Sequence, residues 1–280
     1  MIGELRWMTI CLIIMGTIDM DVGVLLAGGV GSRFWPLSKK NRPKQFMCNF
    51  NGKTFLKCAY ERLEKVFGSK PHAQLVVTNE KYVDLINTDL PDVLILPENK
   101  SRNTAPAIAF AVAKALTMGA NRMIVVPADH AFEREEIMVN ALKKALDFVE
   151  KVPLLVVFGA KPLYPHTGYG YIKVGGSVDV EKFGEIKFVR RFFEKPSLER
   201  AKLYVNSGEY LWNMGIFVWS VEAVLKAFED ELPDYHEVIL KIADLMSKGN
   251  GNFEDFNYEL EKLEPFSIDI GLIERVRNIA

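Results

Sequence analysis

Apolar residues follow two different spacings along the first 160 residues of the chain. In one spacing they form short runs rich in Val, Ile and Leu, which is typical of buried strands. In the other they recur every three or four positions, which is typical of helices that bury one face. The two kinds of segment alternate, and this order favours an α/β fold, doubly wound, with a mainly parallel sheet and helices on both faces. The strand-like runs are residues 22–26, 74–78, 93–96, 123–126 and 154–158, and the helical segments are 54–67, 81–87 and 139–149.

The pattern changes after residue 160. Prolines, glycines and aromatic residues replace the helical spacing, so a turn-rich segment is expected before the next strand. From 221 to 264 the spacing is helical again, with a break at Pro233. Between these two regions the predicted elements are a strand at 187–196, a helix at 198–205 and a strand at 210–220.

The first predicted strand ends in a glycine-rich turn at 27–29, and two cations, Arg33 and Lys44, follow it. Glycine accepts backbone angles that other residues refuse, and it lets a phosphate approach the main-chain N–H groups. The segment is not a P-loop, because it has no Gly-Lys-Ser/Thr, and it is not a dinucleotide fingerprint, because Phe34 replaces the third glycine. Backbone donors and cations together predict a triphosphate site. Its expected members are Leu26, Ala27, Gly28, Gly29, Gly31, Ser32, Arg33 and Lys44.

Polar side chains that could bind a ligand lie just after one later strand and within two others. Asp129 comes just after the run 123–126, and ligands of open parallel sheets bind beyond the carboxyl ends of the strands, so Asp129 is placed to hold Mg²⁺. The alternative is a turn aspartate at the start of the next helix. Glu194 can accept two hydrogen bonds, Lys195 offers a point charge and Asn213 offers an amide, although an isolated Glu-Lys-Pro at 194–196 would be a surface turn.

Composition narrows the class of protein. Of 280 residues, 49% are apolar, and 35 Lys and Arg against 36 Asp and Glu give a net charge of −1, so nothing points to nucleic acid or to a membrane. The three cysteines have no CxxC spacing, which favours reduced thiols and a cytoplasmic location. The apolar run at 8–15 is too short to span a bilayer, so residues 1–20 are interpreted as an N-terminal extension.

Four motifs, LLAGGVGSRFWPLS with RPKQF, PENKSRNTAPA, TGYGYI and FFEKP, resemble those of the sugar-nucleotide pyrophosphorylases. Within that family they are most similar to mannose-1-phosphate guanylyltransferases. The resemblance implies a nucleotidyltransferase sheet of Rossmann-like, glycosyltransferase-A-like type. It also implies transfer of GMP from GTP to mannose 1-phosphate with Mg²⁺ as cofactor, giving GDP-mannose and pyrophosphate.

The resemblance also implies site residues. Arg102, Asn103 and Thr104, at the start of a helix expected from Pro106, would bind the nucleotide, and Tyr169 and Gly170 would line the sugar pocket. In that pocket Glu194 and Asn213 would meet sugar hydroxyls, and Lys195 would meet the sugar phosphate. The catalytic domain would cover 21–280, with a nucleotide half at about 21–150 and a sugar-phosphate half at about 151–280. The residues expected to act in catalysis are Arg33, Lys44, Asp129 and Lys195.

The end of the chain departs from this pattern. EPFSIDIGLIERV at 264–276 resembles the family's SIDxxxMEK, with Ile273 and Arg275 in place of Met and Lys. Family members continue with a strand carrying WxDxGSW, so the domain is expected to be C-terminally incomplete at Ala280. Asp269, in SID, is interpreted as a structural cap.

Two other functions remain open. One is another hexose-1-phosphate nucleotidyltransferase, which would share the glycine-rich turn and EKP, although RNTAPA with TGYGYI argues against it. The other is a non-catalytic relative that binds GDP-mannose and regulates a partner. The sequence also leaves a homodimer open.

Overall fold

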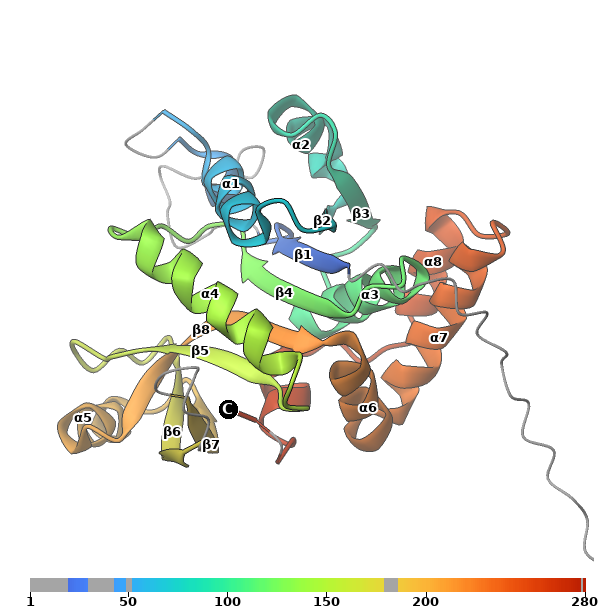
Figure 1. Cartoon of the computed structure of the whole chain (residues 1–280). Helices are drawn as coiled ribbons and strands as arrows, with labels where there is room; N and C mark the ends of the chain where they lie inside the picture. The colour runs from blue at the N-terminus through green and yellow to red at the C-terminus, as the bar shows by residue number, and fades with distance from the viewer. Residues whose placement is uncertain (1–19, 30–42, 49–51, 179–185, 278) are drawn as a thin grey trace, which may run out of the picture.

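The computed structural model describes residues 20–29, 43–48, 52–178, 186–277 and 279–280. In this part of the chain eight strands form one sheet, in the order β3-β2-β1-β4-β8-β6-β7, with β5 paired to β8 (Figure 1). The strands are β1 (Asp21–Leu26), β2 (His72–Asn79), β3 (Leu94–Glu98), β4 (Arg122–Pro127), β5 (Val156–Ala160), β6 (Gly170–Ser177), β7 (Lys187–Glu194) and β8 (Tyr210–Ser220).

The helices lie between and after these strands. The helices are α1 (Phe55–Phe67), α2 (Val83–Asp89), α3 (Thr104–Thr117), α4 (Glu135–Val149), α5 (Leu198–Ser207), α6 (Val221–Glu231), α7 (Pro233–Ser247) and α8 (Phe253–Leu260). Three short turns are also helical: η2 (Lys44–Phe46), η3 (Glu80–Tyr82) and the π-type turn η4 (Asp269–Ile273). Among the described residues, none of these helices combines the length and apolar character needed to cross a bilayer.

The first half of the sheet is parallel, as the alternation of strands and helices predicts. β1 pairs in parallel with both β2 and β4, and β2 pairs in parallel with β3. The second half is antiparallel, because β8 runs against β4, β5 and β6, and β6 runs against β7. The α/β doubly wound fold is therefore confirmed, with an antiparallel extension whose strand directions the sequence pattern did not specify.

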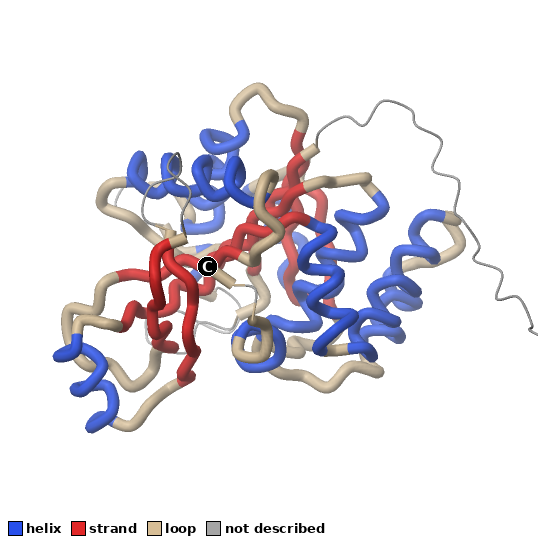
Figure 2. The backbone as a smooth tube through the Cα atoms, turned by 60° about the horizontal axis from the view of Figure 1, so that its bottom comes forward, coloured by secondary structure: helices blue, strands red, loops and turns tan. Residues whose placement is uncertain are grey.

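Helices cover both faces of the sheet (Figures 1 and 2). Alternate residues of β1 face opposite ways: Val22 and Val24 pack into the cluster with α3, and Leu25 into the cluster with α1 and α4. Gly23 lets α1 pack directly on the strand, because an added Cβ would lie 2.8 Å from Leu63 Cδ1. The core thus fixes the position of β1, whose end carries the glycine turn.

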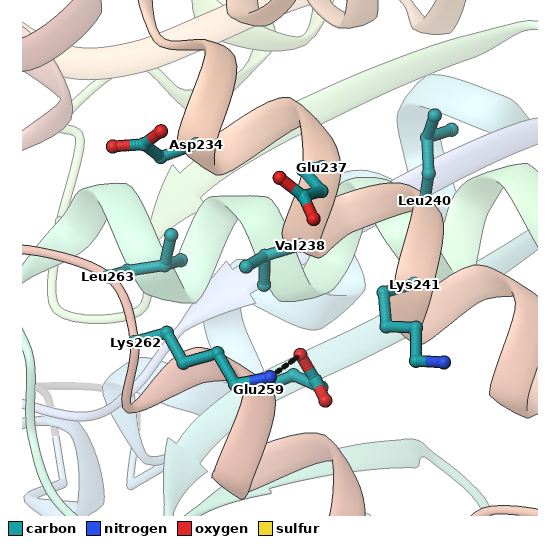
Figure 3. A pocket seen from close by; sticks show the side chains of 8 residues that line it. All are labelled: Asp234, Glu237, Val238, Leu240, Lys241, Glu259, Lys262 and Leu263. Carbon is teal, nitrogen blue, oxygen red and sulfur yellow. Dashed lines mark hydrogen bonds and ion pairs between the residues drawn. The ribbon is translucent and has the colours of Figure 1, made fainter.

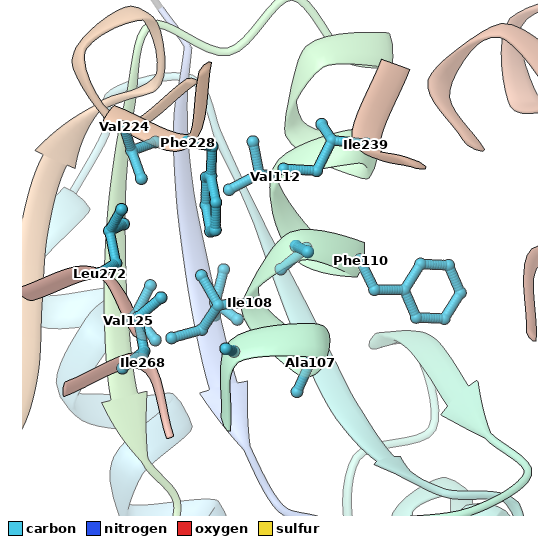
Figure 4. Packing of buried hydrophobic residues seen from close by; sticks show 14 of the residues in the cluster. Ala107, Ile108, Phe110, Val112, Val125, Val224, Phe228, Ile239, Ile268 and Leu272 are labelled. Atoms are coloured by element: carbon cyan, nitrogen blue, oxygen red, sulfur yellow. The ribbon is translucent and has the colours of Figure 1, made fainter. Parts of the chain in front are cut away.

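Helix α3 lies in the centre of the larger apolar cluster. Its Ile108 and Val112 are buried beside Phe228 of α6, Ile239 of α7 and Leu272 of η4 (Figure 4). Frequent alanines keep this helix slim enough to be enclosed on nearly all sides. The chain after residue 221 therefore returns to pack on the parallel half of the sheet.

Helix starts follow the expected capping chemistry. The Thr54 side chain accepts from Lys57 N–H at the start of α1, and Asn252 forms a capping box with Asp255 at α8. Helix α3 begins at Thr104, two residues before the predicted start, because the Asn103 side chain already accepts from Thr104 N–H.

A buried ion pair joins the amino ends of β1 and β4. Arg122 donates from Nε to Asp21 Oδ1 at 2.7 Å and from a second nitrogen to Asp21 Oδ2 at 3.1 Å. Its third nitrogen donates to Glu150 at 2.6 Å. This bidentate contact fixes the register of the two strands, so their carboxyl ends lie together at the opposite edge.

Candidate active site

The candidate site lies where the strand order of the parallel half reverses. β2 and β3 lie on one side of β1 and β4 on the other, and this switch point is where ligands of open α/β sheets bind. A cavity of about 320 Å³ opens beyond the carboxyl ends of β1 and β4. Residues lining it include Gly28, Gly29, Glu98, Asn103, Asp129 and Asp269.

Side chains from two other segments hold the glycine turn. Gln45 Nε2 donates to Ala27 O at 2.7 Å and to Gly29 O at 3.1 Å, and Ser101 Oγ donates to Gly28 O at 3.0 Å. An added Cβ at Gly29 would meet no atom of the described protein within 4 Å, so the space above the turn is open. Sequence reasoning did not assign Gln45, although it belongs to the RPKQF motif. Of the predicted members, Gly31, Ser32 and Arg33 lie outside the described residues.

Lys44 and Asp129 come together beside this turn. Lys44 Nζ lies 3.3 Å from Asp129 Oδ2; the Asp129 side chain is 39% exposed, and the residue lines the cavity. Among the described residues there is no group of three His, Cys, Asp or Glu side chains that could hold a metal ion. Asp129 therefore fits Mg²⁺ only as a carboxylate ligand that shares the ion with phosphate oxygens, which is the usual arrangement for this metal.

Glu98 is a carboxyl group in the cavity wall that sequence reasoning did not assign. Its side chain is 3% exposed, and its Oε1 has no hydrogen-bond partner among the described residues. Burial raises the pKa of Glu98 to about 8, and the charge of Arg102 opposes this rise. A buried acceptor without a partner is costly to leave unpaired, and Glu98 lines the cavity, so this carboxyl is a candidate ligand contact.

Of the predicted nucleotide residues 102–104, two line the cavity and one contacts a residue outside it. Asn103 and Thr104 line the cavity, whereas an Arg102 nitrogen lies 3.3 Å from Glu261 just beyond α8. The Thr104 hydroxyl accepts from Ile268 N–H at 2.9 Å and so ties the segment before η4 to the start of α3.

The predicted sugar residues converge at the start of β6. Gly170 pairs with Glu194 across β6 and β7, and an added Cβ on Gly170 would lie 2.7 Å from Glu194 Oε2 and 3.3 Å from Asn213 Cβ. Lys195 Nζ lies 3.0 Å from Glu194 Oε1. Next to them, the Tyr169 ring stacks on another aromatic side chain, His166, at 4.0 Å between centroids.

Asp269 joins this group from the far end of the chain. Asn213 Nδ2 donates to Asp269 Oδ1 at 2.7 Å, although the two residues are 56 positions apart. The expectation that Asp269 is a structural cap is wrong, because the turn has no cap from its N-terminal residue and Ser267 Oγ accepts from Ile270 N–H instead. The turn packs against β7, and Asp269 is one of the residues that line the cavity.

Two predicted site residues have strained backbones. Asn103 has φ of 72° and Lys195 has φ of 45°, and no other non-glycine residue in the described ranges has positive φ. Such conformations cost of the order of 1–3 kcal/mol each and concentrate at ligand-binding positions. The strain thus supports a ligand site on both the nucleotide side and the sugar side.

A larger cavity of about 610 Å³ lies away from these residues, on α7 and the end of α8 (Figure 3). Its charged side chains have both signs, and two of them, Lys262 and Glu259, already pair at 2.6 Å. It is far from the strand ends at which the predicted residues meet. We therefore take the cavity beyond β1 and β4 as the candidate active site.

Comparisons with known proteins point to one family. The family model described as "Nucleotidyl transferase" matches residues 22–258. A mannose-1-phosphate guanylyltransferase of Escherichia coli is 36% identical over 229 residues, which cover 79% of this chain and 48% of that protein. A mannose-1-phosphate guanylyltransferase 2 of Escherichia coli O157:H7 is 34% identical over 272 residues, covering 91% of this chain and 54% of that protein.

A solved structure shares the fold at similar identity. It is described as a mannose-1-phosphate geranyltransferase from Thermus thermophilus, and it aligns with a TM-score of 0.80 and 31% identity over 92% of this chain and 72% of its own. A structure described as a mannose-6-phosphate isomerase from Helicobacter pylori aligns with a TM-score of 0.71 and 28% identity, over 92% of this chain and 95% of its own. The present chain spans about half the length of the curated relatives described above.

Proposed function

Because this chain belongs to the nucleotidyl transferase family, we propose that it transfers GMP from GTP to mannose 1-phosphate, giving GDP-mannose and pyrophosphate. One observation carries the proposal: a single cavity at the strand switch point is lined by the glycine turn and by Asp269, which contacts the predicted sugar residue Asn213. The names of the guanylyltransferase relatives supply the choice of substrates.

Glu98 supports guanine as the base. Guanine has two adjacent donors, N1–H and the N2 amino group, on one edge, and a carboxylate is an acceptor with room for both. Because burial raises the pKa of Glu98 to about 8, the carboxyl loses its proton when guanine binds near neutral pH. Adenine has an acceptor at N1, and uracil and thymine flank their one N–H with carbonyl oxygens, so these bases place acceptors against the carboxylate. A site built to pair with a donor discriminates strongly against a ligand that lacks it.

The reaction requires no covalent protein intermediate. An oxygen of the sugar phosphate attacks the α-phosphorus of GTP in line, and the bond from that phosphorus to the bridging oxygen breaks, with its electron pair leaving on pyrophosphate. The protein contributes positioning and charge neutralisation. Lys44 and Arg33 would meet the triphosphate, and Lys195 the sugar phosphate. Asp129 would hold Mg²⁺, whose charge offsets that of the phosphates when it is bound.

Turnover with a panel of substrates tests the proposal. Pyrophosphate release is measured for GTP, ATP, UTP and dTTP, each with mannose 1-phosphate and with glucose 1-phosphate. We expect GTP with mannose 1-phosphate to be the best pair. A preference for UTP or dTTP with glucose 1-phosphate would contradict it, and binding of GDP-mannose without pyrophosphate release would favour a regulatory relative.

A further inference from the structure

Asp269 joins the cavity to the predicted sugar residue Asn213. It lines the same cavity as Gly28 and Asp129, and its Oδ1 accepts from Asn213 Nδ2 at 2.7 Å. Burial raises the pKa of Asp269 to about 6, and among the charges that act on it are those of Glu194 and Lys195. The charge of Lys195, the residue predicted to meet the sugar phosphate, thus acts on the Asp269 carboxyl.

The contact with Asp269 also fixes the Asn213 amide. Asn213 Oδ1 accepts from Gly215 N–H at 3.0 Å while Nδ2 donates to Asp269, so both ends of the amide are held. An amide nitrogen has two hydrogens, and a carboxylate has about four lone-pair sites. The pair therefore keeps one N–H donor and further acceptor capacity beyond the bond between them.

The position of Asp269 is set by tertiary contacts. Ile268 N–H donates to Thr104 Oγ1 at 2.9 Å, and Ala105 N–H donates to Phe266 O at 3.1 Å, so the start of α3 anchors the segment. Gly271 in the same turn lies against the Phe266 ring, where an added Cβ would overlap it. A carboxylate held in this way is preorganised, which is what recognition of one hydroxyl requires.

We propose that Asp269 is a specificity-determining residue for the hexose 1-phosphate. It accepts a hydrogen bond from one sugar hydroxyl while its Oδ1 keeps the Asn213 amide turned toward the same sugar. The inference rests on the proposed function and deepens it. A carboxylate only accepts, so this position selects a sugar that presents a hydroxyl donor there, and a sugar without that donor leaves the charge unpaired.

Binding to the full chain tests this role separately from turnover. Calorimetry gives the affinities of mannose 1-phosphate, its monodeoxy analogues and GTP for the unchanged chain, Asp269→Asn and the control Asp244→Asn. Asp244 is an exposed residue of α7 that pairs with Lys248. We expect Asp269→Asn to weaken mannose 1-phosphate by about 10- to 100-fold, the loss of one charge-assisted hydrogen bond, and GTP by less than about twofold.

The analogues separate direct contact from a structural effect. One monodeoxy analogue should bind the unchanged chain more weakly by a similar factor, yet bind Asp269→Asn as well as mannose 1-phosphate does. Equal affinities of the unchanged chain and Asp269→Asn for mannose 1-phosphate overturn the inference alone. The inference is also overturned if every monodeoxy analogue loses as much affinity for Asp269→Asn as it loses for the unchanged chain. No binding of mannose 1-phosphate by the unchanged chain overturns the proposed function, and the inference with it.

Discussion

The Glu98 carboxyl combines two properties that conflict in the unliganded protein. It is nearly fully buried, and one of its oxygens has no hydrogen-bond partner among the described residues. A group of this kind costs stability when it ionises, but it gains a strong hydrogen bond when a ligand donates to it. At the scale of the residue, the proposed guanine contact thus predicts two effects of the ionised Glu98 carboxyl. It lowers the unfolding free energy of the unliganded protein, and it strengthens the binding of GTP.

Glu98→Gln should change the pH dependence of stability. The carboxyl has an ordinary pKa of 4.5 in the unfolded chain and about 8 in the folded protein, so between these values the folded state binds the extra proton. Stability therefore falls as the pH rises from 4.5 to 8, by roughly 1 kcal/mol per pH unit. Glutamine does not titrate, so the variant should be more stable than the unchanged chain at about pH 8 and similar near pH 4.5.

Urea unfolding of both proteins at about pH 5, 6.5 and 8 measures this difference. Without urea at about pH 8, where the Glu98 carboxyl ionises, Glu98→Gln should bind GTP about tenfold more weakly and should discriminate less against ATP, because glutamine offers one acceptor where the carboxylate offers two. If the unfolding free energies of the two proteins change with pH in parallel, the pKa of Glu98 is not raised by burial as described.

At the scale of the element, the pairing of β6 with β7 sets the geometry of the sugar side. The register places Gly170 opposite Glu194, and the small size of glycine lets the carboxylate lie over the strand. β8 pairs with β6 along its other edge and brings Asn213 to the same place. Three residues from three strands therefore meet only because this register is kept.

Gly170→Ala should displace the Glu194 carboxylate. The new methyl group would lie 2.7 Å from Glu194 Oε2 and 2.7 Å from Phe192 Cζ, closer than real Cβ contacts. We expect the KM for mannose 1-phosphate to rise about tenfold and the KM for GTP to stay within about twofold. Gly176→Ala on the same strand is the matched control, because its added Cβ would meet no described atom within 4 Å. Equal effects of the two substitutions would contradict this account.

At the scale of the whole molecule, the last described segment joins the two sides of the site. The chain leaves β8, forms α6, α7 and α8, and returns so that Ile268 meets Thr104 and Asp269 meets Asn213. Ala280 then donates to Leu155 O at 2.9 Å and accepts from Val157 N–H at 2.9 Å, beside β5.

Thr104→Val tests whether Thr104 holds this segment or binds the nucleotide. Valine has nearly the same shape but no acceptor for Ile268 N–H, so the unfolding free energy should fall by about 1–3 kcal/mol. Thr104→Ser keeps the hydroxyl and should lose less. A KM for GTP that rises in Thr104→Val without any loss of stability would instead favour the nucleotide contact inferred from the resemblance.

The sequence by itself determined the elements and the positions of the loops. Runs of Val, Ile and Leu and the spacing of helical apolar residues reflect burial, which is a local property, so most strands and helices were predicted within a few residues. β6 (Gly170–Ser177) was missed, because its glycines and aromatic residues favoured a turn-rich segment there. Because the turn 27–29 and Asp129 directly follow predicted strands, their place at one edge of a parallel sheet followed as well. The resemblance of FFEKP to a family motif led to the prediction of Glu194 and Lys195 as site residues.

Only the tertiary structure decided which distant residues meet. The direction of β8 and the contact between Asn213 and Asp269 depend on how segments 56 residues apart pack, which no local pattern encodes. The lack of a hydrogen-bond partner for Glu98 Oε1 among the described residues likewise depends on which side chains the neighbouring elements place around it. Local sequence fixes periodicity and therefore burial, whereas strand order and the packing of remote segments fix the distances and charges that make a site.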